Sequence, residues 1–268
     1  MVANEHTNSN AGHSDESNAV SRRRMLQTTG AAVVAGAGLS AASGSVAADT
    51  DEIMEVDFRY GTPSIYDAPQ GEDEVVFNVH GYTGSSASVS QAGQFQETAR
   101  SLGYTETVTA VTWDDSGLPW SAEASARDTG DMFASWLGDY KNANPDTTIR
   151  ILGHSMGGIV QMETLAAIGG SFTVETADSI GSYEVADGPC ESGDFYTAIQ
   201  DSAGEVRNYY STNDSIARLG SGPADCGGWF SDGTTPSNYW DVDVSDSVPD
   251  HTSYKESSGC VTKIISNY

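Results

Sequence analysis

The sequence has few basic side chains: 12 Lys and Arg residues stand against 38 Asp and Glu, and only three of its 268 residues are lysines. The formal net charge is −26. A surface this acidic repels nucleic acids and anionic membranes before any contact forms, which excludes both as natural partners. The charge does not indicate a disordered chain, because 38% of the residues are apolar and aromatic side chains are spread along the sequence.

The scarcity of lysine in so acidic a chain is typical of folded proteins from extreme halophiles. In those cells dense salt screens the repulsion between surface carboxylates. An acidic protein from an ordinary cell is the alternative that the composition leaves open.

The N-terminal region lacks a long run of large apolar side chains. Its apolar stretch, residues 30–42, is short and consists mainly of Ala, Gly and Val, which argues against a stable membrane anchor. Three arginines at 22–24 precede it and four small residues at 45–48 follow, the order of an export signal. The paired arginines resemble a twin-arginine signal. We therefore expect a disordered lead and signal peptide at 1–48 and one secreted domain at 49–268.

Cysteine is also scarce, with Cys190, Cys226 and Cys260. One disulfide and one free thiol are possible outside the cell, but the sequence does not determine the pairing. No cysteine lies in a turn beside a candidate base, which argues against a catalytic thiol. The acidic clusters have no histidine partners, and no G-x-G-x-x-G sequence or P-loop is present, so we predict no metal and no cofactor.

Strand-length and helix-length segments alternate in the expected secreted domain. This order predicts a mainly parallel sheet with helices on both faces, the α/β class. Strands are expected at 74–79, 105–113, 147–152, 177–183, 206–211 and 239–244, and helices at 90–102, 122–140 and 156–168.

One short motif carries chemistry. Gly153-His154-Ser155-Met156-Gly157 is a G-x-S-x-G sequence, which is weak evidence alone but here joins an expected strand to an expected helix. A serine on such a sharp turn exposes its hydroxyl, and the glycines tolerate the tight backbone. The helix N-terminus also favours developing negative charge. Ser155 is therefore the candidate nucleophile.

This segment resembles the nucleophile elbow of the α/β-hydrolase family, and its GHSMGG sequence is similar to secreted bacterial lipases and esterases. Upstream, residues 78–84 (NVHGYTG) close a strand, as the HG motif of the family's oxyanion loop does. The resemblance implies that the backbone amides of Tyr82 and Met156 hold the oxygen of a tetrahedral intermediate. It also implies that His80 orients this loop.

A serine hydroxyl is a poor nucleophile until a base accepts its proton, and a histidine suits that task. The expected cleavage of the signal segment removes His6 and His13. By the resemblance, His80 belongs to the oxyanion loop and His154 to the elbow. His251, in a loop after the last expected strand, is the histidine that remains for the base.

The family's chain order of serine, acid and histidine places an acid before His251. Asp214 directly follows the expected strand 206–211, as the family's acid does, and would orient the imidazole. Asp187 and Asp243 are the alternatives.

The resemblance thus implies a secreted serine hydrolase that cleaves carboxylic esters, with a small-molecule or lipid ester as substrate. Two alternatives stay open. The same triad would serve an amide, peptide or thioester bond, and a hydrolase scaffold can also be a non-catalytic binding protein. The sequence does not indicate the oligomeric state, the acyl chain length or a lid.

The net charge leads us to predict that thermal stability depends on salt. Because repulsion between surface carboxylates weakens as the Debye length shrinks, we expect the unfolding temperature to rise as KCl is raised from about 0.1 M to above 1 M. Circular dichroism melts across this series measure it. An unfolding temperature that does not change with salt would contradict the halophile interpretation.

Overall fold

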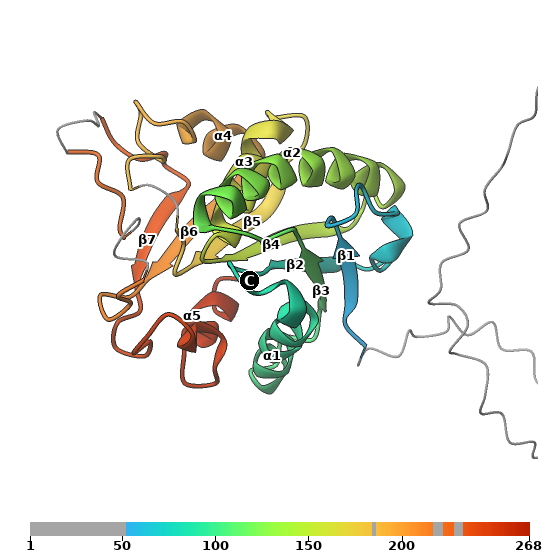
Figure 1. Ribbon diagram of the computed structural model, residues 1–268, viewed down its shortest axis with the longest axis horizontal. Helices are drawn as coiled ribbons and strands as arrows, with labels where there is room; N and C mark the ends of the chain where they lie inside the picture. The colour runs from blue at the N-terminus through green and yellow to red at the C-terminus, as the bar shows by residue number, and fades with distance from the viewer. Residues whose placement is uncertain (1–51, 184–185, 217–221, 228–232) are drawn as a thin grey trace, which may run out of the picture. The chain divides into compact units, whose positions relative to one another are not determined.

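A computed structural model describes residues 52–183, 186–216, 222–227 and 233–268 (Figure 1). The expected signal peptide at 1–48 lies outside the described residues and stays a prediction.

Seven strands form one sheet in the order β1-β3-β2-β4-β5-β6-β7. Every pairing between neighbouring strands is parallel. The strands are β1 (Met54–Asp57), β2 (Glu74–Val79), β3 (Thr107–Thr112), β4 (Thr148–His154), β5 (Val174–Ile180), β6 (Ala203–Tyr210) and β7 (Tyr239–Asp243). The predicted parallel sheet is therefore confirmed, and within the described residues it contains no antiparallel strand.

Helices cover both faces of the sheet, as predicted (Figure 1). On one face lie α2 (Pro119–Ala143), α3 (Gly157–Ile168) and α4 (Tyr196–Ser202); on the other lie α1 (Ser88–Ser101) and α5 (Val261–Ile265). Because both faces are covered, the central strands are buried on both sides, and all of β2 after its first residue is buried.

Aromatic side chains fill the core between the sheet and α2. Phe77 of β2 lies edge-on to Phe133, Trp136 and Tyr140 of α2, with ring centroids 5.5–5.7 Å apart. All four side chains are almost completely buried. The spacing of Phe133 and Trp136 in the sequence indicated this helix, and the packing fixes α2 against the strand that leads to the HG motif.

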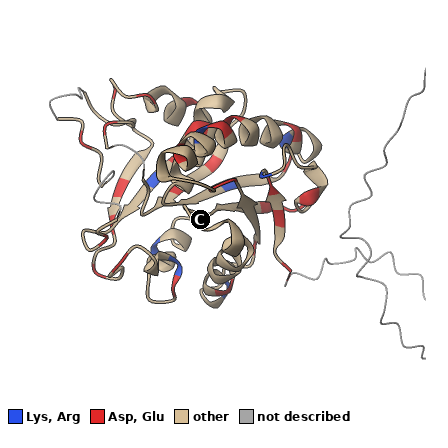
Figure 2. Cartoon of the chain, viewed as in Figure 1, with Lys and Arg blue, Asp and Glu red and all other residues tan. Residues whose placement is uncertain are grey.

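Acidic side chains are spread over many elements, whereas basic ones are few (Figure 2). The described arginines are used mainly in ion pairs. Arg150 binds Glu74 through Nε at 2.8 Å, Arg59 binds Asp57, Arg127 binds Glu163, and Arg207 binds Glu205. Two of these pairs join different elements, β4 to β2 and α2 to α3, and the few cations leave most of the acidic charge uncompensated.

Candidate active site

Ser155 lies in a sharp turn between β4 and α3. Its φ is +53°, and only Thr83 shares a positive φ among the non-glycine residues in the described part of the chain. Three backbone hydrogen bonds hold the turn: Ser155 donates to Ile180, and its carbonyl accepts from Gly158 and Tyr183. A non-glycine residue in this conformation is strained, and the surrounding contacts maintain it. This is the geometry expected of a nucleophile elbow.

The turn packs against the loop that follows β2. A Cβ atom on Gly157 would lie 2.6 Å from the carbonyl oxygen of Val79, and one on Gly81 would lie 2.8 Å from Cβ of Ser155. Both approaches are closer than any side chain permits, so glycine is required at each position. The HG motif and the elbow are therefore direct neighbours at the carboxyl edge of the sheet.

His80 is a buried anchor of this loop. Its Nδ1 lies 2.8 Å from the carbonyl oxygen of Gly81, and its Nε2 accepts from the backbone amide of Trp113 at 3.1 Å. The imidazole also stacks on the Trp113 ring, with 5.2 Å between centroids. Burial lowers the pKa of His80 to about 4. The ring is therefore neutral at pH 7 and donates through Nδ1, which suits an orienting role.

Tyr82 directly follows the HG motif, and Met156 directly follows Ser155 in the elbow. Neither backbone amide donates a hydrogen bond among the residues that the structure describes. Met156 directly precedes the first turn of α3, where helix amides point outward. The Tyr82 side chain is fixed separately, because its hydroxyl donates to the carbonyl of Gly117 at 2.8 Å.

The loop after β3 is hydrogen-bonded to the loop that carries the HG motif. The backbone amide of Ser85 donates to the Asp115 carboxylate at 3.0 Å, and the Trp113 indole donates to the carbonyl of His80 at 2.8 Å. Sequence analysis did not indicate these contacts, which join two loops through residues without a shared motif.

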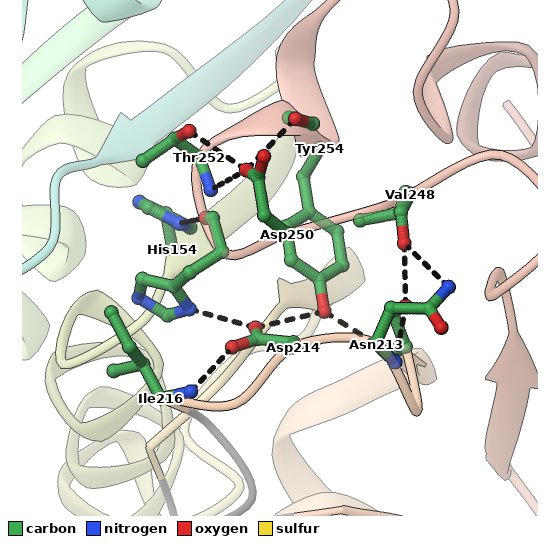
Figure 3. A network of polar contacts seen from close by, with 11 residues as sticks. His154, Asn213, Asp214, Ile216, Val248, Asp250, Thr252 and Tyr254 are labelled. Atoms are coloured by element: carbon green, nitrogen blue, oxygen red, sulfur yellow. Dashed lines mark hydrogen bonds and ion pairs between the residues drawn. The ribbon is translucent and has the colours of Figure 1, made fainter.

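Asp214 and His251 are brought together from the loops after β6 and β7. His251 Nδ1 lies 2.7 Å from Asp214 Oδ2 (Figure 3). The Asp214 side chain is completely buried, and that of His251 is 12% exposed. The two residues were predicted as acid and base, and they lie in the relation which those roles need.

The two alternative acids lie elsewhere. The carboxylate of Asp243 accepts from Ser245 at 2.8 Å, and the carbonyl of Asp187 accepts from Cys190. Neither makes a hydrogen bond with His251 in the described residues. Of the three candidates, Asp214 alone contacts the imidazole.

His154 connects the elbow to the His251 loop. Its Nε2 lies 3.0 Å from the carbonyl oxygen of His251, and the two rings are 4.9 Å apart between centroids. Burial lowers the pKa of His154 to about 3, so the ring is neutral and donates through Nε2. Within the described residues the hydroxyl of Ser155 forms no hydrogen bond. Its chain neighbour His154 makes the contact that places His251 beside the elbow.

Tyr254 is a part of the site that sequence analysis missed. Its hydroxyl lies 3.1 Å from Asp214 Oδ2, and the backbone amide of Ile216 donates to Asp214 Oδ1 at 3.0 Å (Figure 3). Tyr254 follows His251 by three residues and belongs to no sequence motif, so the sequence did not indicate its contact with Asp214.

A small cavity of about 30 Å³ lies beside α3 and the ends of β5 and β6. None of the five predicted site residues lines it. Cys190 and Cys226 form a disulfide, and Cys260 is a buried free thiol. This resolves the pairing that the sequence left open.

The described residues contain no group of three His, Cys, Asp or Glu side chains able to hold a metal ion. No helix among them has the length and apolarity needed to cross a membrane.

The model of a family described as "alpha/beta hydrolase of unknown function (DUF900)" matches residues 67–206. A comparison with curated proteins found no match. Among solved structures, the catalytic core domain of an acetyl xylan esterase from Trichoderma reesei is 14% identical, with a TM-score of 0.43 over 74% of this chain and 96% of that one. A lipase-esterase related protein from Clostridium acetobutylicum is 10% identical, with a TM-score of 0.43 over 75% and 96%.

The close approach at Gly157 predicts the effect of one methyl group. In Gly157→Ala the added Cβ meets a backbone oxygen that cannot rotate away, and we expect a loss of about 1–3 kcal/mol in the free energy of unfolding. Gly138→Ala in α2 is the matched control, because its Cβ would lie 3.9 Å from the nearest atom. That change is expected to be neutral or stabilising by up to about 1 kcal/mol. Equal urea midpoints for the two variants would contradict this account.

The lowered pKa of His80 predicts a pH dependence. Because the unfolded chain binds a proton at this histidine near pH 6.5 and the folded chain only near pH 4, its contribution to stability is complete above about 6.5 and falls toward pH 4. Burial raises the pKa of Asp178 to about 6, which acts with the opposite sign in the same range. The test is therefore a difference: the free energy of unfolding of His80→Gln should fall less between pH 7 and pH 4 than that of the wild type. Parallel curves would refute it.

Proposed function

From the premise that this chain belongs to the α/β-hydrolase family described as DUF900, we propose that it is a serine hydrolase that cleaves carboxylic esters. Ser155 is the nucleophile, His251 the base and Asp214 the acid. The observation that carries the proposal is the 2.7 Å contact between His251 Nδ1 and Asp214 Oδ2, at the edge of the sheet where Ser155 occupies a left-handed turn.

In the first step the hydroxyl of Ser155 attacks the ester carbonyl, and Nε2 of His251 accepts its proton. Asp214 holds the proton on Nδ1, which keeps Nε2 free as the acceptor and stabilises the imidazolium. The amides of Tyr82 and Met156 donate to the oxygen that becomes negative. Neither amide has another acceptor in the described residues, so neither must break a bond to do so.

Collapse of this intermediate expels the alcohol, which takes the proton from His251 and leaves an acyl-enzyme on Ser155. Water then attacks the acyl carbon while His251 again accepts a proton, and the acid is released. The two other histidines in the described residues cannot replace His251, because His80 and His154 are engaged through their rings and their pKa values are lowered to about 4 and about 3.

We propose further that the enzyme is exported through the twin-arginine route and works outside the cell in salt. The Cys190–Cys226 disulfide supports export, because structural disulfides persist in oxidising compartments. The net charge of −26 supports a saline environment.

Substitution of Ser155 tests the proposal. In at least 1 M KCl we expect the wild type to hydrolyse nitrophenyl esters and Ser155→Ala to lose at least about 10³-fold in kcat. His251→Gln should lose a comparable factor, because members of a triad act as a unit. Ser171→Ala, a remote exposed serine, is the matched control and should keep wild-type activity.

A fluorophosphonate probe separates the alternatives. Labelling of the wild type and not of Ser155→Ala, without ester turnover, would favour an amide, peptide or thioester substrate. Failure to label the wild type would favour a binding protein. Ester hydrolysis that survives in Ser155→Ala would exclude the proposed mechanism.

A further inference from the structure

We propose that Tyr254 is a positioning residue for the acid: its hydroxyl fixes the Asp214 carboxylate in the orientation that faces His251. The inference rests on the proposed function, in which Asp214 orients the base. It concerns a residue outside the triad and outside the oxyanion loop.

The direction of the hydrogen bond follows from its partners. Tyr254 lies in the 3₁₀ helix Ser253–Lys255, and its hydroxyl oxygen lies 3.1 Å from the backbone nitrogen of Ser211 and 3.1 Å from Asp214 Oδ2. A backbone amide can only donate, so the hydroxyl is the acceptor from Ser211. Its single proton is then directed at the Asp214 carboxylate.

The tyrosine keeps that proton throughout the working range of a histidine base. Burial, together with the neighbouring Asp214 carboxylate, raises the pKa of Tyr254 above its ordinary value. The hydroxyl is thus a permanent donor, unlike an ammonium or imidazolium group, whose charge changes with pH.

The phenol ring of Tyr254 is tightly packed. Only 1% of Tyr254 is exposed, and its carbonyl accepts from the backbone of Cys260. Gly181, at φ +52°, makes room on the other side: a Cβ there would lie 2.7 Å from Cε2 of Tyr254 and 3.0 Å from Asp214 Oδ2. One glycine therefore allows both the ring and the carboxylate to occupy their places.

The carboxylate has three described donors, from two segments of the chain. Tyr254 and His251 share Oδ2, and the amide of Ile216 binds Oδ1 (Figure 3). Loss of the phenol proton removes one of the two donors described for Oδ2, and we expect the carboxylate to be less firmly held in the orientation that faces His251. Misplacement of a supporting group lowers catalysis without weakening substrate binding, because the effect appears in the transition state.

Tyr254→Phe tests this role, with Tyr209→Phe as the matched control. Tyr209 is also completely buried, and its hydroxyl accepts from Asn267 at 3.0 Å rather than contacting Asp214. Both variants lose one buried hydroxyl and keep the ring. On a nitrophenyl ester we expect kcat to fall about 10-fold in Tyr254→Phe with KM unchanged, and to stay near wild type in Tyr209→Phe. A fall caused only by lost stability would appear in both variants.

A second readout does not depend on turnover. The Nδ1 proton of His251 is expected as a downfield proton resonance, assigned by its absence in His251→Gln. It should move or broaden in Tyr254→Phe and stay in place in Tyr209→Phe. An unchanged resonance in Tyr254→Phe overturns the inference, as do equal kcat values for the two variants. If the wild type hydrolyses no ester, the proposed function fails, while the resonance still decides whether Tyr254 positions Asp214.

Discussion

The left-handed backbone of Ser155 is the constraint on which the candidate site depends. A serine can hold this conformation only if the chain before and after it is fixed, and β4, α3 and the hydrogen bond to Ile180 provide that support. This conformation also requires glycine where α3 begins, because a Cβ atom on Gly157 would collide with the carbonyl oxygen of Val79. The loop with the HG motif therefore lies beside the serine as a consequence of backbone packing.

Environment assigns different tasks to three histidines of similar intrinsic basicity. His80 and His154 are engaged through their rings, and burial keeps them neutral. His251 retains partial exposure and has a carboxylate on Nδ1. Its other nitrogen can therefore take up a proton in the proposed reaction. The two neutral histidines hold loops in place: His80 joins two loops, and His154 donates to the carbonyl of His251.

Much of this arrangement could be predicted because it follows local rules. Ser155 was found from glycines around a strand-to-helix turn, and the sheet from the alternation of segments. Asp214 required the family's chain order, since abundant aspartates offered rivals. Tyr254 and the Cys190–Cys226 pairing could not be predicted, because they depend on where loops meet in space. A lone tyrosine in a polar segment has no periodicity, and three cysteines permit three pairings.

Salt affects the charges on the surface and the buried contacts of the site to different degrees. Surface carboxylates repel over distances that salt shortens to about 3 Å at 1 M, so salt governs them strongly. Asp214 is buried, and the contacts described for it are with the N–H groups of His251 and Ile216 and the O–H of Tyr254. Hydrogen bonds between buried groups are short and lie out of reach of the ion atmosphere, so salt hardly weakens them. The contacts described for this carboxylate are therefore with N–H and O–H donors that salt does not displace. Because these donors are not displaced by mobile ions, we expect the geometry of the acid to be independent of the salt that we propose the fold needs.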